Sequence, residues 1–179
     1  DGGTFAELQT EYTARKTAFE TADSNLTEDI SGDYHRAKKD FEDASANLTA
    51  GQSTLSNYEQ TKNSTASAAA TSTENAAQDG ANQLAAEQAL KDYNDQYALV
   101  NGGSGVSADD SLVGIKDAKQ AAFETDDYES TGVSIKSHYE TLKQTFDNAY
   151  DSFNTETEDA NGNKWANNNQ TRSIKTVYE

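Results

Sequence analysis

The 179-residue chain has no cysteine, no methionine and only two histidines, and these absences exclude several kinds of chemistry. Without cysteine the chain can form neither a disulfide nor a thiolate nucleophile or metal ligand. A zinc site would need carboxylates beside His35 and His138, and no spacing typical of such a site occurs. The sequence also has no phosphate-binding glycine loop and no Gly-x-Ser-x-Gly nucleophile turn. We therefore expect no catalytic residue, no metal ligand, no cofactor and no enzymatic activity.

Basic residues are scarce, because 14 Lys and Arg stand against 31 Asp and Glu and give a formal net charge of -17. Phosphate contacts need Lys and Arg, so nucleic acid and anionic membranes are not expected partners. No run of about 20 apolar residues occurs, so no membrane-spanning helix is expected. We interpret acidic clusters such as Asp109-Asp110 and Asp126-Asp127 as solvated residues near helix ends. Weak binding of divalent cations between subunits is the alternative.

Large apolar side chains are few. Leu, Ile, Val and Phe make up roughly 13% of the chain, below the roughly 20% under which a highly charged chain is usually disordered. A folded chain of this composition is expected to take part of its stability from neighbouring copies. This expectation favours a homo-oligomer or polymer.

The chain does contain a repeated helical phrase, in which Lys is followed by Phe three residues later and then by an acidic residue. Its four copies centre on Phe19, Phe41, Phe123 and Phe146, and the copy at Phe123 has Gln120 in place of Lys. Three copies also have a Tyr seven residues before the Phe. Repetition of this kind indicates a packing unit. We predict that its aromatic residues mediate packing and assembly: Tyr12, Phe19, Tyr34, Phe41, Tyr139, Phe146 and Phe153.

Apolar residues recur at alternating intervals of three and four, which predicts amphipathic helices along most of the chain. The predicted fold is all-α, an elongated helical bundle of two similar antiparallel helix hairpins joined by a central helix, with a polar C-terminal tail. The expected parts are a first hairpin at 1–62, a low-complexity segment with a central helix and Gly-rich loop at 63–107, a second hairpin at 108–156 and an Asn-rich tail at 157–179.

Two local structures stay open at this point. The segment from Thr27 to Asp33 favours a turn inside residues 4–62, and Ser31-Gly32-Asp33 is its strongest signal. One continuous helix is the alternative, because the 22-residue shift between the first two copies is close to six helical turns. Residues 63–82 are rich in Ala, Ser, Thr and Asn, which is typical of either a linker or a thin, Ala-faced helical extension.

The ends of the chain lead to an expectation about its location. Asp1 without an initiator Met leads us to expect removal of a signal peptide, with a fragment as the alternative, and hence an extracellular or cell-surface protein. Val177-Tyr178-Glu179 resembles the sites cut by head-maturation proteases of tailed phages, which implies a virion as an alternative location. Four Asn-x-Ser/Thr sequons are candidate glycosylation sites: Asn25, Asn47, Asn63 and Asn169.

Together these features favour a non-enzymatic structural subunit that self-assembles through its repeated helical faces into an extracellular filament or surface layer. One alternative is a virion protein, of the phage head or its decoration, processed at its termini. Another is a monomeric helical adhesin module that binds a host ligand.

Overall fold

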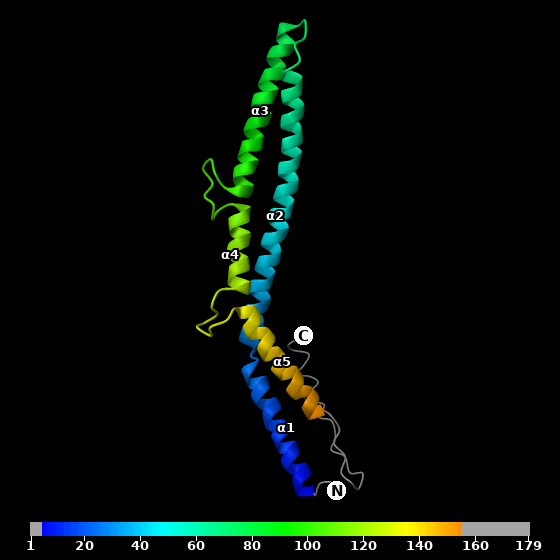
Figure 1. Ribbon diagram of the computed structural model, residues 1–179, viewed down its shortest axis with the longest axis vertical. Helices are drawn as coiled ribbons and strands as arrows, with labels where there is room; N and C mark the ends of the chain where they lie inside the picture. Colours follow the sequence, from blue (N-terminus) through cyan, green and yellow to red (C-terminus); the bar gives the residue numbers. More distant parts are fainter. Residues whose placement is uncertain (1–4, 155–179) are drawn as a thin grey trace. The chain divides into compact units, whose positions relative to one another are not determined.

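A computed structural model describes residues 5–154, with side chains from residue 10 onward. The regular secondary structure of this part of the chain is all helical, apart from an isolated antiparallel bridge between Gly103 and Val106. The all-α prediction is therefore confirmed (Figure 1). The helices are α1 (Phe5–Asn25), α2 (Glu28–Ala69), α3 (Ala76–Asn101), α4 (Leu112–Glu124) and α5 (Ile135–Asn154).

The chain divides into two compact units. Unit 1 comprises residues 1–37 and 123–179, and unit 2 comprises residues 38–122. Both boundaries fall inside helices, since α2 and α4 each contribute residues to both units. Unit 1 is thus assembled from segments that are distant in the sequence, whereas unit 2 is one continuous stretch.

In unit 1, α1 packs antiparallel against α5 (Figure 1). The ring centroids of Tyr12 and Phe153 are 5.6 Å apart, and so are those of Phe19 and Phe146. Residues later in α1 therefore contact residues earlier in α5, as expected for antiparallel helices. The buried core of this unit comprises Phe19, Ala22, Leu26, Tyr139, Phe146 and Phe153. Burial of these aromatic rings is the main source of stability for the helix pair.

The turn predicted over Thr27 to Asp33 is confirmed only at its start, because the helix break lies between Asn25 and Glu28 while Ser31, Gly32 and Asp33 lie inside α2. The chain breaks earlier, between α1 and α2, where Thr27 caps the new helix. The backbone N–H of Ile30 donates to Thr27 Oγ1 at 3.3 Å, and acidic residues occupy the first turn of α2. Capping and favourable charge at a helix N-terminus are each worth about 0.5–2 kcal/mol. They outweigh the cost of about 1 kcal/mol for a glycine inside a helix.

In unit 2, α2 lies beside α3 and approaches it closely at Gly51 (Figure 1). A Cβ atom added to Gly51 would overlap the Leu112 side chain and lie 3.3 Å from Val100 Cγ2. Gln96 Nε2 also donates to the Gly51 carbonyl at 3.4 Å. Gly51 therefore does not interrupt α2; it allows the neighbouring side chains to pack against the helix backbone.

The low-complexity segment adopts the helical alternative over most of its length. Helix α2 continues to Ala69, and α3 begins at Ala76 after a short turn. Asn75 caps α3 by accepting from the backbone N–H groups of Ala77 and Gln78. Asp79 holds the turn, because it accepts from the backbone N–H and the hydroxyl of Thr73 at 2.8 and 2.7 Å. These hydrogen bonds lower the pKa of Asp79.

The loop between α3 and α4 is defined by a cap at each end. Helix α3 ends at Asn101, as the Gly-rich sequence predicts, and Gly102 adopts a φ of 87° while its N–H donates to the Ala98 carbonyl at 2.8 Å. Such a left-handed conformation favours glycine at a helix end. Helix α4 is capped by Ser111, whose Oγ accepts from the N–H of Gly114 at 3.0 Å. This cap of α4 is buried, since Ser111 is only 1% exposed.

Candidate functional site

The repeated phrase has the same local structure in three of its copies, because its Lys pairs with the acidic residue one turn later. An (i, i+4) ion pair of this type supports a helix by a few tenths of a kcal/mol. The pairs are Lys16–Glu20 at 3.7 Å, Lys38–Glu42 at 3.9 Å and Lys143–Asp147 at 2.9 Å. All are partly exposed, so they are a feature of the helix surface.

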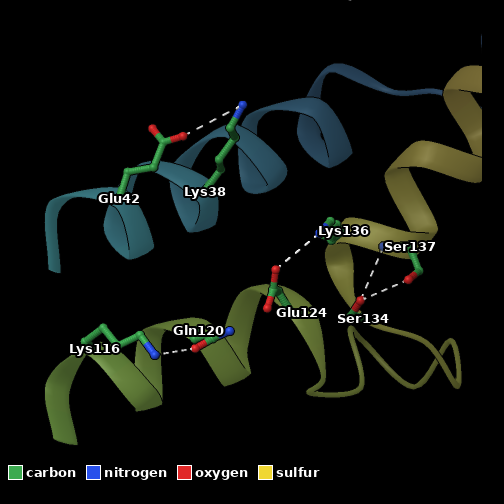
Figure 2. Close-up of polar contacts among 8 residues, drawn as sticks. All are labelled: Lys38, Glu42, Lys116, Gln120, Glu124, Ser134, Lys136 and Ser137. Atoms are coloured by element: carbon green, nitrogen blue, oxygen red, sulfur yellow. Dashed lines mark hydrogen bonds and ion pairs between the residues drawn. The ribbon is translucent and has the colours of Figure 1, made fainter. Parts of the chain in front are cut away.

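The copy at Phe123 uses its acidic residue differently, as Figure 2 shows. Gln120 replaces the Lys and accepts from Lys116 Nζ at 2.5 Å. Glu124 is thereby left without its intrahelical Lys and pairs with Lys136 of α5 at 3.2 Å. The hydrogen bond to Glu124 raises the pKa of Lys136. In this copy of the repeat the ion pair joins two helices of unit 1, whereas in the other three copies it lies within one helix.

Six of the seven predicted packing residues lie together in unit 1. Tyr34 and Tyr139, at the same position of their repeat copies, stack with ring centroids 4.1 Å apart. Phe19 and Phe153 are also stacked, at 5.6 Å. Phe41 lies half-buried on α2 in unit 2. The unit 1 side chains pack on each other within a single chain, so an assembly contact has to involve other surfaces as well.

Both histidines lie beside tyrosine rings of unit 1. His35 is exposed, and its ring lies 5.2 Å from Tyr34 and 5.9 Å from Tyr139. His138 is half-buried, with its ring 5.9 Å from Tyr128. These contacts give each histidine a packing role.

Tyr128 forms a contact that the sequence did not reveal. It lies in the loop between α4 and α5, and its hydroxyl donates to Asp33 Oδ2 on α2 at 2.8 Å. Burial, and then the hydrogen bond to Asp33, raise the pKa of Tyr128 to about 12. The loop has a defined shape, because the N–H of Gly132 donates to Asp127 Oδ1 at 2.7 Å. Loop residues usually show no periodicity, so the sequence carries no signal for this long-range pairing.

Between residues 5 and 154, no group of three or more His, Asp or Glu side chains is arranged to hold a metal ion. A shallow, open depression on α5 is lined by Ser137, Glu140, Thr141, Gln144 and Thr145. All five residues come from one helix, so the depression does not enclose a ligand. None of the described helices is long and apolar enough to cross a membrane.

Three of the four sequons fall within the described residues. Asn25 is exposed at the end of α1, and Asn47 and Asn63 are exposed along α2. Asn169 and the predicted tail at 157–179 lie outside the described residues. Glycosylation of these asparagines stays a prediction.

The exposed apolar side chains are concentrated on α3. Every exposed leucine among the described side chains belongs to this helix: Leu84, Leu90 and Leu99, at 68%, 49% and 44% exposure. Tyr97, also on α3, is 47% exposed. In a chain with so few large apolar residues, their accumulation on one helix marks α3 as the candidate interaction surface.

Comparison with known proteins adds no relative, since no family model, no curated protein and no solved structure matches the chain. The fold therefore defines the class, an all-helical bundle, and the surface of α3 is the feature from which a function is argued.

Proposed function

We propose that this chain is a non-enzymatic structural subunit that self-assembles into an extracellular filament or surface layer. The observation that carries the proposal is the exposure of Leu84, Leu90, Tyr97 and Leu99 on α3. Burying a side chain of this size contributes about 1.5–3 kcal/mol. Three of the nine leucines of the chain are exposed on this helix, and a partner that covered them would stabilise the chain.

The helical repeats fit such a role, because the chain uses them to build structure. In unit 1 the repeat aromatics form the core, and the ion pairs of the repeats support the helices that carry it. Polar side chains also contribute to holding the structure together. The Tyr128 hydroxyl, for example, donates a hydrogen bond to Asp33. A helical scaffold with exposed apolar side chains on one of its helices fits a structural subunit.

Charge determines the conditions under which copies would associate. A net charge of -17 makes two copies repel each other at low ionic strength. Salt shortens the range of this repulsion to about 8 Å at physiological ionic strength and about 3 Å at 1 M. Apolar contacts are not weakened by such screening, so self-association is expected to strengthen with added salt.

Sedimentation velocity of the full chain over a range of protein and salt concentrations tests the proposal, with negative-stain microscopy of the associated fraction. We expect reversible association at micromolar concentrations that increases with salt, together with regular particles or filaments. A chain that stays monomeric under all these conditions refutes self-assembly and favours the monomeric adhesin module instead. Location is tested separately, by fractionating cells that express the full-length gene.

A further inference from the structure

Tyr34 of α2 and Tyr139 of α5 form a stacked pair of phenol rings between two helices of unit 1. Their ring centroids are 4.1 Å apart, and their planes are inclined by only 15°. Tyr139 is 4% exposed, whereas Tyr34 is half-buried. The rings of Phe123 and His35 lie 5.5 and 5.2 Å from that of Tyr34. These neighbours and the burial of Tyr139 hold the two phenol rings face to face.

The composition of the chain directs oxidation to its aromatic residues. Cysteine and methionine are the side chains that oxidants commonly modify, and the chain has neither, but it has nine tyrosines and one tryptophan. A tyrosine that loses one electron and its phenolic proton becomes a radical, with unpaired spin on the ring carbons ortho to the oxygen. Two such radicals join when they meet. Rings that are already in contact therefore couple without a diffusional encounter.

We propose that Tyr34 and Tyr139 are the site of an intrachain dityrosine bond, formed by a peroxidase with hydrogen peroxide as the oxidant. One carbon–carbon bond forms between ortho carbons of the two rings, and one carbon–hydrogen bond breaks on each ring. The two electrons and two protons released reduce one H₂O₂ to two molecules of water, and both hydroxyl groups are kept. Nearly parallel rings at 4.1 Å already approach the roughly 3–3.5 Å from which bonds form.

The partial exposure of Tyr34 gives the oxidant access to the pair. The radical formed on Tyr34 takes an electron from the stacked ring of Tyr139, so the buried ring is oxidised without touching the enzyme. A second oxidation of Tyr34 then places radicals on both rings. Only one member of the pair therefore has to face solvent.

The bond would tie α2 covalently to α5 within unit 1. Because residues 38–122 lie between the two tyrosines in the sequence, the closed loop contains all of unit 2. Cross-links that close long loops restrict the unfolded chain most. The bond would thus stabilise a chain that has no cysteine for a disulfide. Both rings belong to one chain, so this inference is independent of the self-assembly proposed above.

Tyr93 and Tyr97 of α3 provide an internal comparison. Their ring centroids are 6.1 Å apart with planes inclined by 42°, and Tyr97 is 47% exposed. If access of the oxidant determined the product, coupling would involve Tyr97. If ring contact determines it, Tyr34 and Tyr139 are the pair that couples.

The test oxidises the full chain with a peroxidase and limiting hydrogen peroxide, and gel filtration then isolates the monomer. Trypsin places the two rings on separate peptides, because it cuts after Lys16, Arg36, Lys136 and Lys143. By mass spectrometry we expect residues 17–36 linked to residues 137–143, with a mass two hydrogen atoms below the sum of the two peptides.

Matched variants show which rings carry the product. Tyr34→Phe keeps the ring but removes the phenol, and it should lower the dityrosine fluorescence of the monomer about fivefold or more. Tyr97→Phe should leave this fluorescence nearly unchanged, and circular dichroism verifies that both variants keep their helix content. A monomer without the link between residues 17–36 and 137–143, or equal losses of fluorescence in the two variants, would overturn the proposal.

Discussion

Phe146 is a fully buried aromatic residue in the core of unit 1, and replacing it with alanine gives a quantitative test of the fold. Its side chain is 0% exposed and its ring lies 5.6 Å from Phe19 and 6.2 Å from Tyr150. A fully buried Phe→Ala substitution costs about 3–5 kcal/mol. Since small domains are stable by only about 5–15 kcal/mol, Phe146→Ala is expected to remove a large share of the free energy of unfolding of unit 1.

The chain offers a matched control in Phe41, which has the same position in another copy of the repeat but is half-buried. Because Phe41 keeps part of its surface in water while Phe146 keeps none, Phe41→Ala is expected to cost less than Phe146→Ala, by about 1 kcal/mol or more. Urea unfolding followed by far-UV circular dichroism gives both free energies of unfolding.

Amide hydrogen exchange shows which helices are destabilised by each substitution. Phe146→Ala should speed exchange in α1 and α5, which share the unit 1 core. Phe41→Ala should do so in the central part of α2. Equal losses of stability for the two variants, or unchanged exchange in α1 when Phe146 is replaced, would refute the assignment of the aromatic seam as the core of unit 1.

Three further predictions concern single positions. Gly51→Ala places a methyl group against the Leu112 side chain, at an overpacking cost of about 1–3 kcal/mol that the helix preference for Ala offsets by about 1 kcal/mol. Gly80→Ala, with nothing within 4 Å, should stabilise α3 by up to about 1 kcal/mol; a melting temperature of Gly51→Ala at or above that of Gly80→Ala would contradict this. In the folded state the pKa of Tyr128 is raised from 10.0 to about 12, so the folded state keeps this proton to a higher pH than the unfolded chain does. The free energy of unfolding should therefore fall as pH rises from 10 to about 12. Urea titrations of Tyr128→Phe should lack this part of the decline. Asp79 has a lowered pKa, so its stabilisation of the turn is present above the ordinary carboxyl pKa and lost as pH falls through the lowered value; acid melts of Asp79→Asn should show a smaller decline than those of the unchanged chain, and identical curves would count against the turn network.

The helices themselves could be predicted from the sequence because their apolar spacing is regular. In α5 the interval pattern through Ile135, Tyr139, Leu142 and Phe146 leaves one buried face, and the structure buries or half-buries all four residues. The end of α3 was also predictable, since Gly102 adopts the left-handed conformation that stops a helix. These features depend on neighbours within a few residues, which a sequence displays directly.

The pairing of helices could not be predicted, because the repeat gives several helices almost the same apolar stripe. Phe19, Phe41 and Phe146 occupy equivalent positions, so periodicity alone does not say which rings meet. The structure pairs α1 with α5. The apparent turn at Ser31-Gly32-Asp33 failed for a related reason, since the cap at Thr27 had already committed these residues to a helix.

Helix α3 shows how a correct pattern can be incomplete. The spacing of Leu90, Tyr93, Tyr97 and Val100 predicts a helix that buries these residues, and the helix is present. Val100 is 1% exposed, yet Tyr97 on the same face is 47% exposed. Periodicity identifies the face that prefers to be buried, but only the structure shows how much of it remains uncovered within one chain.

The discontinuity of unit 1 has a consequence during protein synthesis. Helix α1 ends at Asn25, and its partner α5 begins only at Ile135. At about 5–20 residues per second, the aromatic face of α1 waits roughly 5–20 s on the ribosome before α5 is translated. Residues 38–122 can fold in that interval, because all of unit 2 is already made. The nascent chain therefore exposes Phe19 to chaperones for longer than any residue of unit 2.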